Sequence, residues 1–247
     1  MSQAVFPTRR DESWRYSDLD ALASIWPLPA PHIIAVAPGD HFEQSILIDG
    51  SDGKAAVRHI QMTLGKGATA ALYALNIGGK FGRVELDITL MEGADFTLGC
   101  AQIGGADQVL ELITTVTHAE AGGTSQQMVR NIVGGTATSS YLGKVAVARD
   151  AQKTDSVQDV KAMLLDRSAT ANAKPELEIF ADDVKCAHGC AIGELDAQAL
   201  YYLQSRGLPP AEAKKLLLQA FVAGVFDGAQ DEERLKSLAL AKLGELV

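Results

Sequence analysis

The densest group of side chains that could do chemistry lies at residues 182–190, which read Asp-Asp-Val-Lys-Cys-Ala-His-Gly-Cys. These nine residues hold two carboxylates, two thiols and one imidazole. If the segment is extended, side chains at even offsets share one face, so Cys186, His188 and Cys190 point the same way. Two thiolates and an imidazole suit zinc or iron–sulfur ligation. A complete site would need a fourth ligand, which a partner chain could supply.

The same residues also have a structural interpretation, because free cysteine is among the most buried residue types. Cys186 and Cys190 would then be small core residues, and His188 a hydrogen-bonded residue at a strand end. Cys100 and His118 each follow the phase of an apolar strand pattern, and we interpret both as structural. The remaining histidines have no clustered partners in the sequence and are assigned no role: His32, His41 and His59.

Motifs of common enzymes are missing from the sequence. Two glycine–lysine segments, at residues 65–67 and 78–80, lack the spacing and the Ser/Thr of a phosphate-binding loop. The Gly-x-Ser-x-Gly and His-Glu-x-x-His patterns of hydrolases are also absent. We therefore predict a chain that is not an enzyme and carries no nucleotide. If ATP is used, another chain must hydrolyse it.

Composition narrows the function further. The 247 residues are 47% hydrophobic, which can supply a real core, and the net charge of −9 would repel nucleic acid. No apolar run approaches the roughly 18 residues of a membrane span, and residues 1–10 hold no signal-peptide core. Three cysteines do not suit a disulfide framework. We expect a cytoplasmic protein without nucleic-acid or membrane partners.

The elements that must position residues 182–190 are predicted to be β-strands. Between residues 44 and 193, apolar residues alternate with polar ones, as at Val84, Leu86 and Ile88, and glycine pairs separate the runs. This pattern is compatible with a sandwich, a barrel or a solenoid. The irregular spacing of the glycine pairs favours a parallel β-helix with coils of unequal length over a sandwich.

Two further regions flank this core. Residues 1–43 combine clustered aromatic residues with several prolines, which predicts a short helical lead-in and an extended linker. Residues 194–247 predict a C-terminal helical domain whose helices begin near Asp196, Pro209 and Asp231. The second of these helices has more apolar surface than a small domain needs, which predicts a docking surface. Its apolar residues are Leu216, Leu217, Phe221, Val222 and Val225.

Several motifs resemble the SufD family of the SUF iron–sulfur cluster assembly system. Residues 174–189, Lys-Pro-Glu-Leu-Glu-Ile-Phe-Ala-Asp-Asp-Val-Lys-Cys-Ala-His-Gly, look like the signature of that family. The similarity continues through Gly-Glu-Leu-Asp at 193–196 and Leu-Tyr-Tyr-Leu at 200–203. The N-terminal Glu-Ser-Trp-Arg-Tyr-Ser-Asp-Leu at 12–19 also fits. The amino-acid sequence of residues 174–189 resembles SufD more than its paralogue SufB.

The resemblance implies a mainly β protein with a right-handed parallel β-helix core, an N-terminal helical lead-in and a C-terminal helical domain. It implies a non-catalytic scaffold subunit that pairs with SufB, binds the SufC ATPase through its C-terminal helices, and could form a homodimer when isolated. It also implies that Cys186 and His188 lie near the SufB contact, where a transient iron–sulfur cluster is shared with or held by SufB. Cys190 stands where the family often has alanine, so the resemblance gives Cys190 no role.

Two other functions are compatible with these residues. The first is a β-helix enzyme acting on polysaccharide, since a fold does not fix a function. Such an enzyme needs a groove of catalytic acids or bases and usually a secretory signal. The second is a stand-alone zinc or redox module built on Cys186, His188 and Cys190. That module would bind metal as a single chain, whereas a shared site would need SufB.

Overall fold

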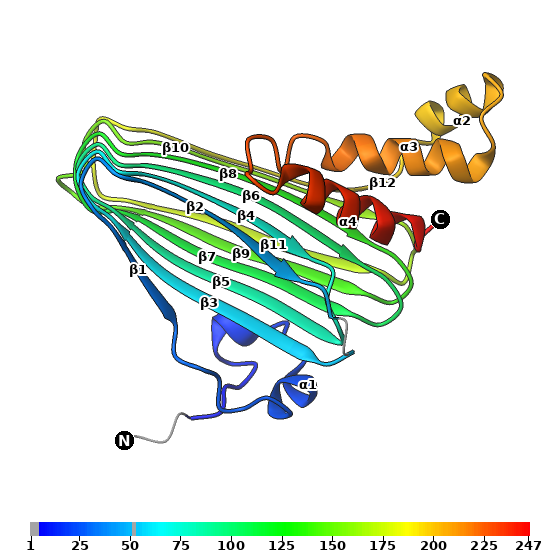
Figure 1. Cartoon of the computed structure of the whole chain (residues 1–247), viewed down its shortest axis with the longest axis horizontal. Coiled ribbons are helices and arrows are strands. Elements are labelled where there is room, and N and C mark those ends of the chain that lie inside the picture. The colour runs from blue at the N-terminus through cyan, green and yellow to red at the C-terminus, as the bar shows by residue number, and fades with distance from the viewer. Residues whose placement is uncertain (1–4, 51–52) are drawn as a thin grey trace.

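The computed structural model describes residues 5–50 and 53–247. In that part of the chain, odd- and even-numbered strands alternate between two six-stranded parallel sheets (Figure 1). Sheet A has the order β1-β3-β5-β7-β9-β11, and sheet B the order β12-β10-β8-β6-β4-β2. The chain is therefore a parallel β-helix with two strands per turn, which confirms the predicted fold class. The strands are β1 (His32–Val36), β2 (His41–Ile48), β3 (Ala55–Leu64), β4 (Thr69–Asn76), β5 (Phe81–Leu90), β6 (Asp95–Gly104), β7 (Val109–His118), β8 (Thr124–Val133), β9 (Thr138–Val147), β10 (Asp155–Leu164), β11 (Thr170–Ile179) and β12 (Lys185–Glu194).

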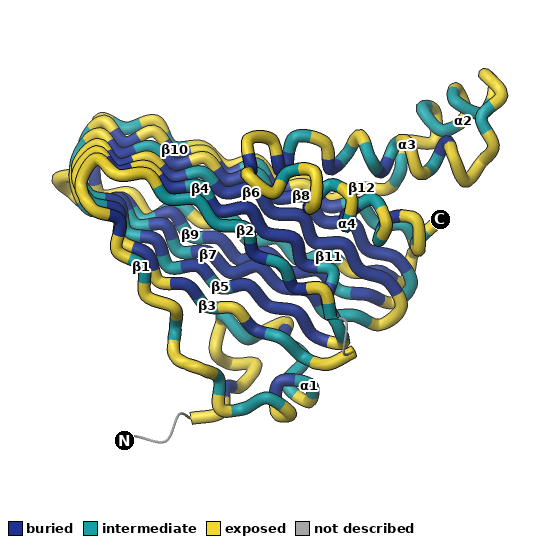
Figure 2. The backbone as a smooth tube through the Cα atoms, viewed as in Figure 1, coloured by how far each residue is buried: buried dark blue, intermediate teal, exposed yellow. Residues whose placement is uncertain are grey.

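Strand β5 shows why the alternating sequence winds into this shape. Leu86 and Ile88 are buried between the sheets, while Glu85 and Asp87 face outward and are partly exposed. In the parallel register each inner residue lies beside its counterparts in the neighbouring turns, so Leu86 pairs with Ile60 of β3. Apolar burial along these columns is the main stabilising term, and Figure 2 shows the buried backbone running through the middle turns.

The turns differ in length, as the irregular glycine pairs predict. Phe81 pairs with Ala55 one turn earlier, and Thr170 pairs with Thr138 one turn earlier. The second pair is separated by more residues of sequence than the first. The extra residues lie in the loops between strands. One loop requires glycine at Gly135, which has a φ of 61° and whose Cβ, if present, would lie 2.8 Å from a backbone oxygen of the preceding turn.

The solenoid begins before residue 44, since β1 starts at His32 and β2 at His41. The sequence pattern does not reveal β1 because it is a short end strand with a single buried residue, Val36. Before it lie the 3-10 helix η1 (Glu12–Trp14) and α1 (Leu19–Ala23). This N-terminal segment packs its apolar residues against sheet A, near Val57 and Phe81.

A buried arginine anchors the N-terminal segment to sheet A. The Arg83 guanidinium lies 3.8 Å from the ring centroid of Trp14 and donates to the carbonyl of Ser13 at 2.6 Å. It also pairs with the buried carboxylate of Glu111 on β7 at 2.8 Å. Glu111 accepts a hydrogen bond from the hydroxyl of Ser17 at 2.9 Å. Because a buried charge is costly without partners, these contacts fix the segment in place.

Three helices follow the solenoid: α2 (Ala197–Ser205), α3 (Pro210–Val222) and α4 (Glu232–Gly244). Helices α3 and α4 share an apolar cluster with the outer face of sheet B, so they do not form a core of their own. Helix α2 projects away from both sheets, and its described residues include none that is buried (Figure 1). None of the described helices has the length and apolar character needed to cross a membrane.

Candidate functional site

Cys186, His188 and Cys190 all lie on β12, which is the last strand of sheet B. The segment is extended, so the three side chains share one face, as the sequence predicts. His188 lies inside the strand rather than at its end, because β12 continues to Glu194. The strand pairs in parallel with β10 on one side, and on the other side it ends the sheet.

The three side chains continue the interior columns of the solenoid. In register they lie beside residues of β10 that are buried in the interior, namely Ser156, Gln158 and Val160. In the described chain no further turn follows, so Cys186 is only partly buried, while His188 and Cys190 are exposed. We call the uncovered face formed by β11 and β12 the open end.

Sheet A ends in the same way. Tyr141 of β9 is fully buried, but Ala173 beside it on β11 is only partly buried, and no residue described in β11 is fully buried. Strands β11 and β12 therefore both leave one edge and one interior face uncovered. The unpaired N–H and C=O groups of such an edge are able to pair with another chain.

The thiols of β12 are not activated in the isolated chain. Burial raises the pKa of the Cys186 thiol, the charge of Asp155 adds to this shift, and a backbone hydrogen bond to Ser156 opposes it. Desolvation also raises the pKa of the Cys190 thiol. Both thiols are therefore protonated near neutral pH, and metal binding would release their protons.

The three candidate ligands of β12 form a row rather than a cage. Positions two apart on a strand are separated by about 6.5 to 7 Å. Within the described ranges, the one group of three ligand-type side chains with atoms inside 4.8 Å of one another is His59, Glu85 and Asp87. The row on β12 does not favour the stand-alone zinc module, since a lone zinc ion needs convergent ligands. It leaves room for ligands from a second chain.

His59 corrects an expectation from the sequence, which assigned it no clustered partner. Its Nε2 lies 2.8 Å from the carboxylate of Asp87, and Glu85 pairs with His59 in the sheet register. These carboxylates are a full turn away along the chain. Only the register between neighbouring strands of the solenoid brings the three residues together, and this register cannot be read from the sequence.

A buried polar network lies behind His188. The amide of Gln158 donates to the Tyr141 hydroxyl at 2.9 Å, and this hydroxyl lies 3.3 Å from that of Thr114. Both hydroxyls also contact the amide oxygen of Gln127, at 3.4 and 3.1 Å. The interior next to the open end is therefore polar.

In earlier turns of sheet B the position that corresponds to Gln127 is apolar. Leu98 of β6 pairs in register with Gln127, and Leu72 of β4 pairs with Leu98. This change is hidden in the sequence pattern of β9, because Tyr141 is in phase with the apolar residues Val145 and Val147. Glutamines at matching positions of successive turns, Gln127 and Gln158, are the signal that could have shown it.

Cys100 and His118 lie in the interior, away from the open end. Burial raises the pKa of the Cys100 thiol to about 12, so it is a poor ligand near neutral pH. The His118 Nε2 lies 2.9 Å from the Ser125 hydroxyl, and burial lowers the pKa of the imidazole to about 4. Both residues are core residues in this structure.

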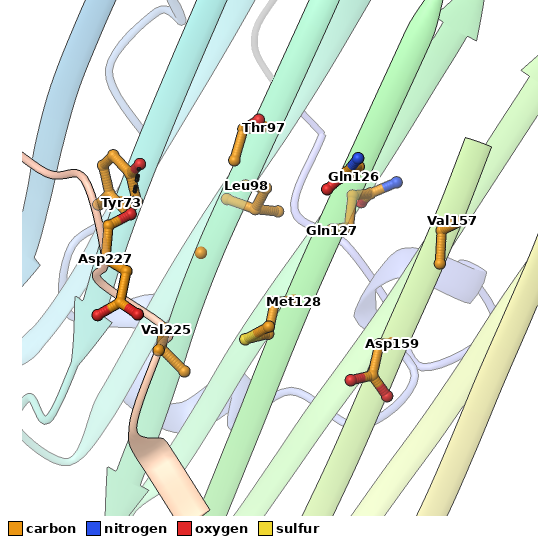
Figure 3. Close-up of a pocket in the computed structure, with 12 residues that line it drawn as sticks. Tyr73, Thr97, Leu98, Gln126, Gln127, Met128, Val157, Asp159, Val225 and Asp227 are labelled. Atoms are coloured by element: carbon orange, nitrogen blue, oxygen red, sulfur yellow. Dashed lines mark hydrogen bonds between the residues drawn. The ribbon is translucent and has the colours of Figure 1, made fainter. Parts of the chain in front are cut away.

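A cavity of about 430 Å³ lies on the outer face of sheet B, beside the loop that follows α3 (Figure 3). On one side the Tyr73 hydroxyl donates to the backbone oxygen of Asp227 at 3.1 Å. On the other side lie Val157, which is exposed, and Asp159, which forms an ion pair with Arg130. Its described lining has no thiol or imidazole, so it adds no ligand to the row on β12.

The apolar stripe predicted on α3 divides between two environments. Val222 and the following Val225 are buried against sheet B and are not available to a partner. Leu216 is 45% exposed. On the neighbouring α2, Tyr201 and Tyr202 are 73% and 56% exposed, so an apolar surface remains at the projecting end of the helices.

Residues 33–221 match the family described as SUF system FeS cluster assembly, SufBD core domain. The iron–sulfur cluster assembly protein SufD of Escherichia coli is 31% identical over 189 residues, which cover 76% of this chain and 44% of that protein. An iron–sulfur cluster assembly SufBD family protein of Synechocystis is 36% identical over 165 residues, covering 66% and 36%. SufD of Bacillus subtilis is 29% identical over 123 residues, covering 50% and 28%. The chain thus spans less than half the length of each of these relatives.

Proposed function

The chain belongs to the SufBD core family of the SUF iron–sulfur cluster assembly system, and from this we propose that it is a non-catalytic scaffold subunit that pairs with a SufB paralogue and binds the SufC ATPase. The single observation that carries the pairing is the open end of the solenoid. Within the described residues, β11 and β12 each present there an unpaired strand edge and an interior face without a covering turn.

An open solenoid end suits a partner with the same architecture. Large apolar side chains are exposed there, with Ile179 at 38% and Ile192 at 46%. Parallel edges and uncovered apolar columns can be continued by the end of a second β-helix, which buries both. A SufB paralogue would have such an end, because it shares the core domain. A second copy of this chain could occupy the same surface when the paralogue is absent, giving a homodimer.

The nascent iron–sulfur cluster is the cargo of this interface in our proposal. Cys186 and His188 face the open end and would contribute ligands, while SufB supplies the others and holds or shares the transient cluster. Thiolate and imidazole both ligate iron. Cys190 lies on the same face, but we assign it no role in the cluster.

The SufC contact is proposed at the projecting helices. Tyr201, Tyr202 and Leu216 offer exposed apolar surface there, outside the cluster that α3 and α4 share with sheet B. The sequence has no phosphate-binding loop, so nucleotide would be bound and hydrolysed by SufC. We place the complex in the cytoplasm, where the three free cysteines would stay reduced.

Pairing at the open end is tested by placing a charge there. In Ile192→Lys a desolvated ammonium would lie at the proposed interface, so the variant should lose its co-purifying SufB paralogue in size exclusion while keeping its own fold. The matched control is Ile33→Lys, which changes an exposed isoleucine on the end strand at the opposite end. Loss of SufB from the control, or retention by Ile192→Lys, would show that the partner docks elsewhere.

The SufC contact is tested separately. The double variant Tyr201→Ser and Tyr202→Ser should release SufC but keep SufB, because α2 projects away from both sheets beyond the C-terminal end of β12 (Figure 1). If SufC remains bound to the double variant, the ATPase uses another surface.

A further inference from the structure

The outer face of sheet A carries a second group of metal-ligand side chains, far from the row on β12 in the turn order. His59 lies on β3, and Glu85 and Asp87 lie on β5, the next strand of the sheet. One ligand atom from each residue lies within 4.8 Å of the others. Since both strands are held in a continuous parallel ladder, the three side chains project from a rigid surface.

Hydrogen bonds orient this group and leave one oxygen of each carboxylate available, while the His59 Nε2 is bonded to Asp87, so a bound metal would take the place of that hydrogen bond. Arg83 donates to one oxygen of Glu85 at 2.9 and 3.1 Å, and His59 and Gln61 contact one oxygen of Asp87 at 2.8 and 3.4 Å. Within the described chain, no hydrogen bond is made by the second oxygen of either carboxylate. An arginine that holds one oxygen of a ligating carboxylate is a typical outer-shell arrangement.

The charges favour a cation. Close to His59, the carboxylates of Glu85 and Asp87 are negative and the guanidinium of Arg83 is positive. That guanidinium is already paired with the buried carboxylate of Glu111. Arg58 lines the cavity beside this group, so three carboxylates stand near two guanidinium groups, which leaves an excess of about one negative charge when the imidazole is neutral. This net negative charge favours a bound cation.

The surroundings also leave a way in. The side chains of His59 and Glu85 are 25% and 21% exposed, so they are partly desolvated but can be reached. Both line a cavity of about 380 Å³, which the N-terminal segment closes with Trp14, Leu28 and Pro29. His32 also lines this cavity. A metal held by three protein ligands would keep an open position toward this cavity.

We propose that His59, Glu85 and Asp87 bind one divalent transition-metal cation of the Zn²⁺ or Fe²⁺ class, independently of the cluster ligands on β12. The imidazole selects this class over Mg²⁺, which prefers oxygen ligands and octahedral geometry.

The test removes the β12 ligands first. Zn²⁺ is titrated calorimetrically into the full chain carrying Cys186→Ser, His188→Ala and Cys190→Ser, and Co²⁺ absorbance gives a second readout. We expect one Zn²⁺ per chain, cobalt d–d bands without thiolate charge-transfer bands, and no displacement by equimolar Mg²⁺. Absence of binding in this background, or equal competition by Mg²⁺, would overturn the proposal.

The ligands are then assigned in the same background. Asp87→Asn and His59→Gln should each weaken Zn²⁺ binding by at least about tenfold, the loss that removal of an outer-shell partner alone can produce. The matched control is Glu178→Gln, which neutralises another acid on sheet A that is paired with Lys144. Circular dichroism confirms that each variant is folded. Unchanged affinity in both site variants, or an equal loss in Glu178→Gln, would overturn the assignment.

Discussion

His188 occupies a position where its chemistry and its contribution to stability can be separated. It is exposed on an edge strand, so truncation removes few packed atoms, and the polar network behind it is held by Gln158. We expect His188→Ala to assemble with SufB and SufC but to lose cluster formation by about tenfold or more, as when a metal site loses a partner. Size exclusion and anaerobic absorbance after reconstitution measure the two effects.

The comparison with Cys190→Ala makes this prediction specific. Cys190 lies on the same face and is also exposed, so its loss should disturb the strand equally little. We expect clusters to form normally in Cys190→Ala. Normal cluster formation by the His188 variant would leave the imidazole with only a structural role.

His118 should give the protein a sensitivity to acid. Burial lowers its folded-state pKa to about 4, whereas the unfolded chain has the ordinary value of 6.5. Between these values the unfolded state binds the proton and the folded state does not, so stability falls as pH falls through this window. The full effect is about 3 kcal/mol, at about 1.36 kcal/mol per unit of pKa.

Urea unfolding at pH 7, 5.5 and 4.5 measures this effect. The variant His118→Asn should show a shallower loss of unfolding free energy with acid than the wild type. The control His41→Asn changes an exposed histidine and should follow the wild-type slope. Equal slopes for all three proteins would show that another group titrates in this window.

At the scale of single elements, α2 depends on its N-cap more than on packing. The Asp196 carboxylate accepts from the backbone N–H groups of Gln198 and Ala199 at 2.8 and 3.2 Å. None of the described residues of α2 is buried. Asp196→Ala should therefore destabilise the helix by about 1 kcal/mol. Because the cost is local, amide exchange in α2 should quicken while the global unfolding midpoint stays unchanged.

Helix α4 offers the matched control for this cap. Asp231 stands at its N-cap position, but its side chain makes no capping hydrogen bond within the described structure. Asp231→Ala should leave exchange in α4 nearly unchanged. A fall in the global midpoint of Asp196→Ala would mean that α2 is coupled to the solenoid more closely than its exposure indicates.

Some elements could be predicted from sequence because local chemistry specifies them. The alternation in β5 is visible residue by residue, and Asp196 and Pro209 mark helix starts that the structure shows, since each is the N-cap of its helix. The end strand β1 carries no such pattern. The burial of Val222 and Val225 was also missed, because an apolar helix face has the same sequence whether it meets sheet B or another protein.

The residues of the candidate site also differ in how far the sequence alone predicts their arrangement. The shared face of Cys186, His188 and Cys190 follows from the two-residue period of a strand and needs no tertiary information. Residues such as His59 and Asp87 meet across turns of unequal length. Their contact depends on the register between strands, which a single sequence without a fixed repeat does not determine.

For the whole molecule, the open end predicts a gradient of stability. In a stacked array each turn is held mainly by its neighbours, so the last turn has support on one side only. In the isolated chain, amides of β12 should exchange faster than those of β6 and β8. Adding the SufB paralogue should slow exchange in β11 and β12 and leave β1 unchanged. Protection of β1 with no change in β12 would place the partner at the wrong end for our proposal.

The N-terminal segment crosses several turns instead of one. Its contacts reach Arg83 on β5, Glu111 on β7 and, through an ion pair between Glu12 and Lys174, the final strand of sheet A. A one-dimensional array with nearest-neighbour coupling can unravel stepwise from a free end. Because this segment is bonded to non-adjacent turns, it adds longer-range coupling, which is small at the last turn, where the Glu12–Lys174 ion pair is exposed. Unfolding of this solenoid should accordingly be more cooperative than a simple stack of independent repeats.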